Sequence, residues 1–171
     1  MRLGILGTLS IGILLAGQVA LAETVKIGFV TTLTGGAGAI GNDMRDAVEL
    51  ALDHLGRKMG NSDVKMFYED DTFKPAVGKQ KTEKLVKKDK VHFVTGYIWS
   101  HVLMASRNSV VGKGPFMITS NAGPGPVAGK LCHEDFFSTS WQNDQTTMAM
   151  GEVLNQLGIK NLYICLLYTA D

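Results

Sequence analysis

Short apolar runs alternate with amphipathic segments along most of the chain, a pattern typical of strands and helices taken in turn. Runs rich in β-branched and aromatic residues predict strands at residues 25–31, 64–68, 91–95 and 115–118. Apolar residues at three- and four-residue steps predict helices that start at Asn42 or Asp43, run from 75 to about 87, and run from 100 to about 111. This alternation implies right-handed βαβ units, so the predicted fold class is α/β with a parallel sheet.

The pattern changes after residue 135. Residues 136–140 are predicted to be an extended connector, residues 144–157 an amphipathic helix that Gly158 ends, and residues 161–164 the beginning of another strand. The last two segments look like the first unit of a second sheet. We therefore expect one lobe over residues 23–140 and only the start of a second lobe over residues 141–164.

An export signal is predicted over residues 1–22. Arg2 gives it a positive start, residues 3–15 form an apolar core too short to span a bilayer, and Ala20 and Ala22 supply the small residues that a signal peptidase requires. Gln18 stands where a lipoprotein would carry its lipidated cysteine. The mature protein is therefore expected to begin at Glu23 and to work in the periplasm.

Composition narrows the class of function only slightly. The chain of 171 residues has a formal net charge of +1, so nothing favours a nucleic-acid partner. Its histidines lie at no spacing typical of a metal site, so no metal is expected. Cys132 and Cys165 are weak evidence for a disulfide bridge. Export of the unfolded chain argues against a cofactor inserted in the cytoplasm, so no cofactor is expected.

Ligands of parallel α/β sheets bind beyond the carboxyl ends of the strands, so the loops after the predicted strands are candidate binding segments. Ser100 is predicted to cap a helix there, where N–H groups and the positive end of the helix dipole suit a carboxylate. Residues 119–124 bring small side chains to the same edge. Tyr97 and Trp99 either offer aromatic faces to a ligand or plug the end of the sheet. Taken together, these loops favour binding.

Gly36, Gly38 and Gly41 match the spacing of a dinucleotide-binding loop between a strand and a helix, and acidic residues end the next strand. An exported nucleotide-dependent oxidoreductase is therefore an alternative function. Residues 32–35 separate the first strand from these glycines, whereas the fingerprint begins almost directly after its strand. The simpler interpretation is a flexible glycine-rich loop at the crevice.

Five segments carry a resemblance through their order and spacing. They are Lys26-Ile-Gly-Phe-Val-Thr-Thr-Leu-Thr-Gly-Gly, Tyr68-Glu-Asp-Asp, residues 81–86, Val94-Thr-Gly-Tyr-Ile-Trp-Ser and Ile118-Thr-Ser-Asn-Ala-Gly-Pro. Together they resemble the periplasmic leucine/isoleucine/valine-binding protein family over residues 25–164. The resemblance implies a type I solute-binding protein of an ABC importer, whose two α/β lobes close on a small carboxylate. It implies permease subunits as partners and no enzymatic activity. A ligand-sensing receptor ectodomain with this fold is a further alternative.

The resemblance also implies which residues hold the ligand. Ser100 matches the serine that binds the ligand carboxylate, and Asn121 and Gly123 match positions that contact the carboxylate and the amine. Threonine usually stands at the position of Gly123, and Trp99 is bulkier than the residue that commonly precedes the serine. Both departures favour an aromatic carboxylate, stacked on Trp99, over a branched-chain amino acid. The expected ligand-binding set is completed by Tyr97 and Ile40.

The end of the chain departs from this family. Its members continue with a turn, a helix and a second lobe near the size of the first. This chain ends instead with Cys165-Leu-Leu-Tyr-Thr-Ala-Asp171. We therefore predict that the chain is an N-terminal fragment of a longer protein and that residues 165–171 are a non-native tail.

Overall fold

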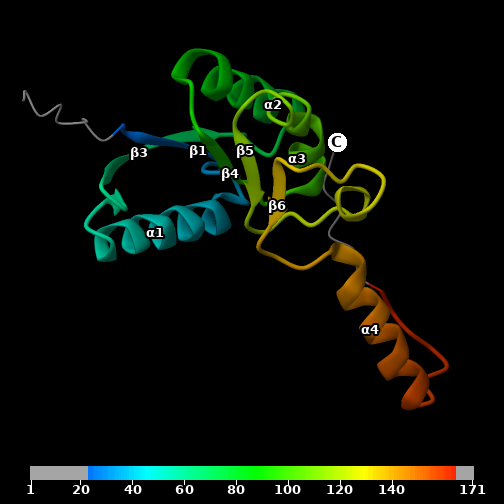
Figure 1. Ribbon diagram of the computed structural model, residues 1–171. Helices are drawn as coiled ribbons and strands as arrows, with labels where there is room; N and C mark the ends of the chain where they lie inside the picture. Colours follow the sequence, from blue (N-terminus) through cyan, green and yellow to red (C-terminus); the bar gives the residue numbers. More distant parts are fainter. Residues whose placement is uncertain (1–22, 165–171) are drawn as a thin grey trace, which may run out of the picture.

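A computed structural model describes residues 23–164, so the predicted export signal and the predicted tail lie outside the described residues. These residues form a six-stranded sheet in the order β2-β3-β1-β4-β5-β6 (Figure 1). The strands are β1 (Val25–Thr31), β2 (Lys58–Met59), β3 (Ser62–Asp70), β4 (Phe93–Gly96), β5 (Phe116–Thr119) and β6 (Phe136–Ser138). The helices are α1 (Gly38–His54), α2 (Pro75–Lys84), α3 (Ser100–Arg107) and α4 (Asn143–Gln156), with a π turn at Leu85–Asp89 and a 3₁₀ turn at Gly125–Ala128.

Every neighbouring pair of these strands is parallel except β2 and β3, which form an antiparallel hairpin. The predicted α/β class with a parallel sheet is therefore confirmed. β1 lies between β3 and β4, with Phe29 beside Tyr68 on one side and Thr95 on the other. The loops after β1, β3, β4 and β5 consequently meet at one edge of the sheet, where ligands bind in folds of this kind.

Residues 136–138 form a strand and not the predicted extended connector. β6 pairs in parallel with β5, with Phe136 beside Met117 and Phe137 beside Ile118. So short a segment has too little pattern to distinguish a strand from an extended loop. The segment becomes a strand because the N–H and C=O groups along the open edge of β5 pair with it.

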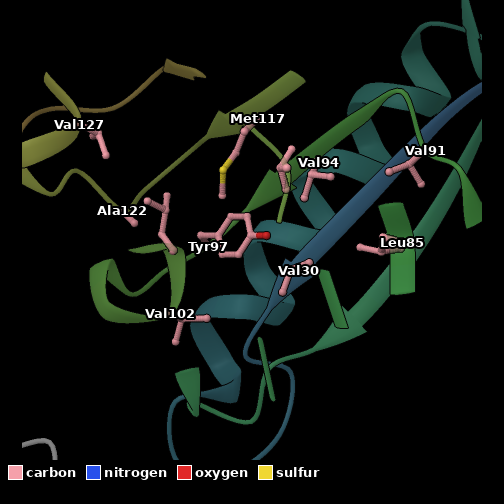
Figure 2. Packing of buried hydrophobic residues seen from close by; sticks show 11 residues of the cluster. Val30, Leu85, Val91, Val94, Tyr97, Val102, Met117, Ala122 and Val127 are labelled. Carbon is pink, nitrogen blue, oxygen red and sulfur yellow. The ribbon is translucent and has the colours of Figure 1, made fainter. Parts of the chain in front are cut away.

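The main core lies between the sheet and the helices α2 and α3 (Figure 2). Alternate residues of each strand point to this face, as Val30 of β1 and Val94 of β4 do. Gly28 shares this face, where a Cβ atom would lie 2.7 Å from the Leu85 side chain, so glycine leaves room for the turn after α2. The fully buried residues of this core include Val30, Leu85, Val94, Tyr97, Val102, Leu103, Val110 and Met117.

The opposite face of the sheet is covered only in part. α1 packs over the side formed by β3 and β1 (Figure 1), where the Tyr68 hydroxyl bonds to the Glu49 carboxylate. Phe93, Phe116 and Phe137 project on this face from β4, β5 and β6, with successive ring centres 5.9 and 6.0 Å apart. Phe116 is 41% exposed and Phe137 is 51% exposed. Parallel sheets are normally buried on both faces, whereas these rings form an aromatic patch that is partly exposed.

The first helix begins at Gly38, inside the glycine-rich loop and ahead of the predicted start. A Cβ atom at Gly41 would lie 1.9 Å from the carbonyl oxygen of Thr32, so this turn packs directly on the end of β1. Asn42 does not cap the helix, because its side-chain amide donates to the carbonyls of Leu33 and Gly38, at 3.1 and 2.7 Å. Glycine has low helix propensity, so the local pattern predicted a loop where tertiary packing produces a helical turn.

Two further segments differ from the prediction. The second predicted strand extends over Ser62–Asp70 and forms a tight hairpin with β2. Residues 161–164, predicted to begin another strand, form none and are exposed. A strand needs a neighbour for its backbone N–H and C=O groups, and no described segment pairs with this one.

α4 extends away from the sheet (Figure 1). Gln142 and Gln145 form a capping box at its start, and none of its residues is buried. Its apolar residues Met148 and Val153 are 73% and 47% exposed. The helix follows the predicted span closely, but its apolar stripe has no partner in the described part of the chain. None of the described helices is long and apolar enough to cross a membrane.

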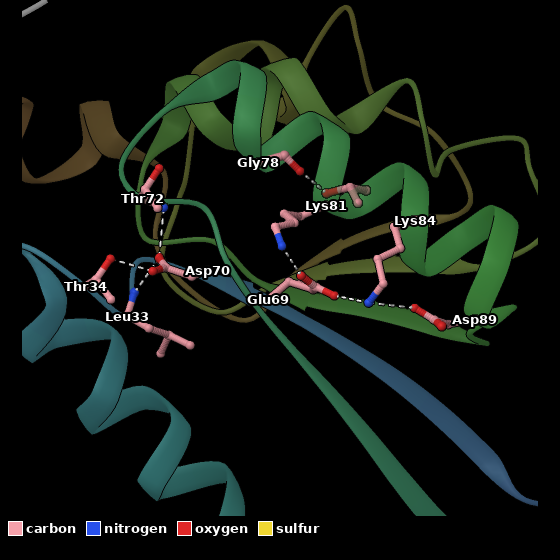
Figure 3. A network of polar contacts seen from close by, with 10 residues as sticks. Leu33, Thr34, Glu69, Asp70, Thr72, Gly78, Lys81, Lys84 and Asp89 are labelled. Atoms are coloured by element: carbon pink, nitrogen blue, oxygen red, sulfur yellow. Dashed lines mark hydrogen bonds and ion pairs between the residues drawn. The ribbon is translucent and has the colours of Figure 1, made fainter.

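A buried carboxylate ties β3 to α2 (Figure 3). The Glu69 side chain is 8% exposed, accepts from the Lys81 ammonium at 2.9 Å, and also pairs with Lys84. Burial by itself would raise the pKa of Glu69. The hydrogen bonds and charges of the two lysines together outweigh burial and hold the pKa below its usual value of 4.5.

We expect Glu69→Gln to make the fold less sensitive to acid. A carboxylate whose pKa is lowered by folding stabilises the protein above its unfolded pKa, and this contribution is lost as the pH falls through the lower folded pKa. Between about pH 7 and about pH 3, the urea midpoint should therefore fall more in the unmodified protein than in Glu69→Gln. Asp63→Asn, on the exposed start of β3, is the control. Identical pH dependence with and without Glu69 would contradict this expectation.

Candidate functional site

Backbone hydrogen bonds join the loops at the carboxyl edge of the sheet. The Asp71 N–H donates to the carbonyl of Thr31 at 3.0 Å, which links the loops after β3 and β1. The Tyr97 N–H donates to the carbonyl of Val30 at 2.7 Å, and the Ala122 N–H donates to the carbonyl of Tyr97 at 2.9 Å. Segments far apart in sequence are thereby held as one surface.

Ser100 is the first residue of α3, and Trp99 occupies the N-cap position predicted for Ser100. No side chain caps the helix, so its first N–H groups and the positive end of its dipole face the edge of the sheet. The Ser100 hydroxyl accepts a hydrogen bond from the Asn143 side-chain amide at 2.9 Å. A hydroxyl that accepts in this way still has its own proton to donate. The arrangement therefore suits an anion.

Trp99 is half-buried and is held on two sides. Its indole N–H donates to the hydroxyl of Thr32 at 3.0 Å. The Phe73 ring meets the indole in a T-shaped contact, with ring centres 4.6 Å apart and planes at 84°. His101 lies 5.2 Å from the Phe73 ring and extends the aromatic cluster. These contacts fix the orientation of the indole while part of it stays accessible.

Asp71 lies behind this aromatic cluster and is fully buried. Its Oδ1 accepts from the Thr32 hydroxyl and from the Phe73 N–H. Burial raises the pKa of Asp71 in spite of these two hydrogen bonds. The Asp71 carboxylate thus contacts both Thr32 and Phe73, the two residues that hold Trp99.

Asp70, the residue before it, is engaged within the fold (Figure 3). Its carboxylate accepts from the N–H groups of Leu33 and Thr72, at 2.9 and 2.8 Å, and from the Thr34 hydroxyl. Burial would raise the pKa of Asp70, but these hydrogen bonds outweigh it and leave the pKa lowered. In a dinucleotide site the acidic residue ending the second strand would face the ribose. Here the loop itself occupies that carboxylate, which does not favour the oxidoreductase alternative.

Tyr97 does not face the site, which corrects its predicted role as a ligand contact. Its side chain is fully buried in the main core (Figure 2), and its hydroxyl lies 2.7 Å from that of Thr82. Burial raises the pKa of this phenol. A left-handed backbone, with φ of 60°, turns the side chain inward directly after β4. Of the two alternatives for this residue, plugging the end of the sheet is the one that the structure shows.

Asn121 and Gly123 lie in the loop after β5. Asn121 is half-buried and lines an apolar pocket of about 210 Å³ together with Phe29 and residues of α1. Gly123 is buried, and its carbonyl accepts from the Asn143 N–H at 2.8 Å. A Cβ atom at Gly123 would lie 2.0 Å from the carbonyl oxygen of Trp141. The neighbouring segment thus fills the space that a threonine side chain would need, which gives the glycine a structural reason.

Ile40, the remaining predicted contact, lies on the first turn of α1 and is 45% exposed. A pocket of about 270 Å³ adjoins Gly123 and is lined in part by Trp141 and Gln142. Ser100 and Trp99 do not line it, and both are partly exposed. No cluster of side chains that could hold a metal ion occurs within residues 23–164.

Four residues of this site were not named as ligand contacts by the sequence interpretation: Thr32, Asp71, Phe73 and Asn143. The first three lie in loops after β1 and β3, which the sequence had already made candidate binding segments, but no role was assigned to them. Nothing in the sequence pairs the four with Trp99 and Ser100, because those pairings are contacts between distant segments.

The sequence matches the periplasmic binding protein family over residues 24–170. The Leu/Ile/Val-binding protein homolog 6 of Brucella abortus is 24% identical over 149 residues, which are 86% of this chain and 38% of that relative. A solute-binding protein of an ABC transporter from R. palustris, solved in complex with benzoate, is 26% identical with a TM-score of 0.76. The match covers 80% of this chain and 38% of that one.

A branched-chain amino acid transporter substrate-binding protein from Streptococcus pneumoniae, solved with isoleucine, shares the fold. Its TM-score is 0.69 at 22% identity, over 79% of this chain and 39% of that one. The chain thus spans 38% of the length of the curated relative that it matches. The family match takes in both the parallel sheet and the loops at its carboxyl edge. The chain therefore belongs to the periplasmic binding protein family.

Proposed function

We propose that the chain forms the first lobe, and the start of the second, of a periplasmic solute-binding protein that delivers a small carboxylate to an ABC importer. The observation that carries this proposal is the position of Ser100, at an uncapped helix start beside Trp99. A serine hydroxyl and free N–H groups at a helix N-terminus bind carboxylates well. The benzoate and isoleucine of the structural neighbours both carry this group.

Binding proceeds by closure of two lobes on the ligand. Residues 23–140 supply one wall of the cleft, and residues 141–164 lead into the other. Asn143, at the start of α4, already donates to Ser100, so the segment that enters the second lobe begins at the ligand site. A ligand held at Ser100 recruits the second lobe and shifts the population from open to closed. The closed form is the one that permease subunits in the membrane recognise.

The ligand is an aromatic acid in preference to a branched-chain amino acid. Trp99 offers a partly exposed ring next to Ser100, so a ligand ring can stack there while its acid group reaches the hydroxyl. Gly123 has no side chain with which to bind an α-amine, and Asn143 and Trp141 pack against its backbone. Asn121 and Ile40 contribute to the same wall.

Fluorescence titration of the protein with its second lobe tests this function. Benzoate should give saturable quenching, whereas NADH should give none. Binding of isoleucine with no response to benzoate would show that the aromatic assignment is wrong. Saturable NADH binding without a response to either acid would instead favour the oxidoreductase alternative. Uptake of labelled benzoate that needs both this protein and the permease would distinguish transport from a sensory role.

Ser100→Ala is expected to weaken benzoate binding by about tenfold or more. One hydrogen bond to a charged group contributes roughly 1.5–3 kcal/mol. Isothermal titration measures the dissociation constant, and Ser109→Ala, beyond the far end of α3, serves as the matched control. An unchanged dissociation constant for Ser100→Ala would remove this residue from the site.

A further inference from the structure

A chain of hydrogen bonds runs from the Trp99 indole into the protein interior. The indole N–H donates to the Thr32 hydroxyl at 3.0 Å, and that hydroxyl donates to Asp71 Oδ1. The direction is fixed because an indole can only donate, an ionised carboxylate can only accept, and a hydroxyl can do both. Three residues that follow three neighbouring strands are thereby joined into one unit.

The same carboxylate oxygen also holds the aromatic neighbour of Trp99. Asp71 Oδ1 accepts from the Phe73 N–H at 2.8 Å. Thr72 and Phe73 have φ values of 50° and 65°, a left-handed conformation that is unfavourable for residues with side chains. Such strain persists only where the surroundings enforce it, and it gathers at ligand-binding sites. Here the strained turn places the Phe73 ring 4.6 Å from that of Trp99.

Stability alone gives a poor reason for this buried carboxylate. Asp71 is 0% exposed, and its Oδ2 has no hydrogen-bond partner among the described residues. A buried polar atom without a partner destabilises a fold, so its presence calls for another explanation. Orientation of the binding surface supplies one.

We propose that Asp71 is a positioning residue that sets Trp99 and Phe73 as a rigid aromatic pair for the ring of the ligand. It acts on Trp99 through Thr32 and on Phe73 through the backbone N–H. This inference rests on the proposed function, because it takes Trp99 as the surface on which an aromatic acid stacks. A fixed indole binds more tightly than a mobile one, since less freedom is lost when the ligand arrives.

The test uses the protein with its second lobe, in a background where Trp141 and any tryptophan of the second lobe are replaced by phenylalanine, so that Trp99 is the fluorescent reporter. Thr32→Val keeps the shape of the side chain and removes the hydroxyl, whereas Thr32→Ser keeps the hydroxyl. Asp71→Ala removes the acceptor, whereas Asp71→Asn keeps an oxygen that can accept both bonds. Two readouts are taken: the dissociation constant for benzoate and the nanosecond anisotropy decay of Trp99.

Thr32→Val and Asp71→Ala should each weaken benzoate binding by about tenfold and add a fast component to the anisotropy decay. Thr32→Ser and Asp71→Asn should stay within about threefold of the parent and show no fast component. If Asp71→Ala does not fold, the Thr32 pair decides the matter. Unchanged affinity and anisotropy in Thr32→Val, while Trp99→Ala loses binding, would overturn the positioning role and leave the proposed function intact. Unchanged affinity in Trp99→Ala would place the ligand away from Trp99 and overturn the positioning role, whereas loss of the proposed function would require that no carboxylate binds at all.

Discussion

Replacing Gly41 with alanine is expected to destabilise the protein strongly. The added Cβ atom would lie 1.9 Å from the carbonyl oxygen and 2.8 Å from the carbonyl carbon of Thr32. Both are backbone atoms, so no side chain can swing aside, and α1 must move away from the end of β1. Overpacking typically costs about 1–3 kcal/mol, and a clash with backbone atoms lies at the upper end of that range, a large share of the roughly 5–15 kcal/mol that stabilises a typical domain. Urea unfolding followed by circular dichroism measures the loss.

Gly36→Ala is the matched control for this prediction. Gly36 lies in the same loop, yet a Cβ atom there would meet nothing within 4 Å. Its free energy of unfolding should stay within about 0.5 kcal/mol of the parent. Equal unfolding midpoints for Gly41→Ala and Gly36→Ala would show that the helix does not press on Thr32 as described.

Loss of the Trp99 side chain is expected to have the largest effect on ligand binding. The indole is half-buried, oriented by Thr32 and Phe73, and adjacent to Ser100. Removal of a central aromatic anchor costs about 2 kcal/mol or more, which corresponds to roughly 30-fold in the dissociation constant. Trp99→Ala in the protein with its second lobe should therefore bind benzoate at least 30-fold more weakly by isothermal titration.

Two variants control this measurement. Trp141→Phe changes the other tryptophan, which is 56% exposed, and should leave the affinity within about threefold. Tyr97→Phe removes a hydroxyl that lies in the core against Thr82, so it should lower stability by about 1 kcal/mol and leave the affinity nearly unchanged. Strong weakening by Tyr97→Phe in a fully folded protein would restore Tyr97 to the site. Full affinity in Trp99→Ala would place the ligand elsewhere.

Local pattern predicted much of the fold because apolar periodicity is a property of neighbouring residues. The strands at residues 25–31 and 115–118 and the helix after Pro75 appear close to their predicted positions. Periodicity did not predict the helical turn at Gly38–Gly41. Glycine propensity favours a loop there, and the contact with Thr32 produces the helical turn. Likewise, residues 136–138 became a strand through pairing with β5.

In the candidate site, too, some features follow from local sequence pattern and others only from tertiary contacts. The sequence by itself determined that Trp99 and Ser100 follow a strand and begin a helix, and the edge of a parallel sheet then follows from βα alternation. Only the tertiary structure decided that Tyr97 turns into the core while Trp99 stays at the surface, since a left-handed φ at Tyr97 reverses its direction. Only the tertiary structure joined Asp71 and Thr32 to Trp99. The physical reason is that side-chain hydrogen bonds between loops depend on how three strands lie beside one another, and no local spacing encodes that.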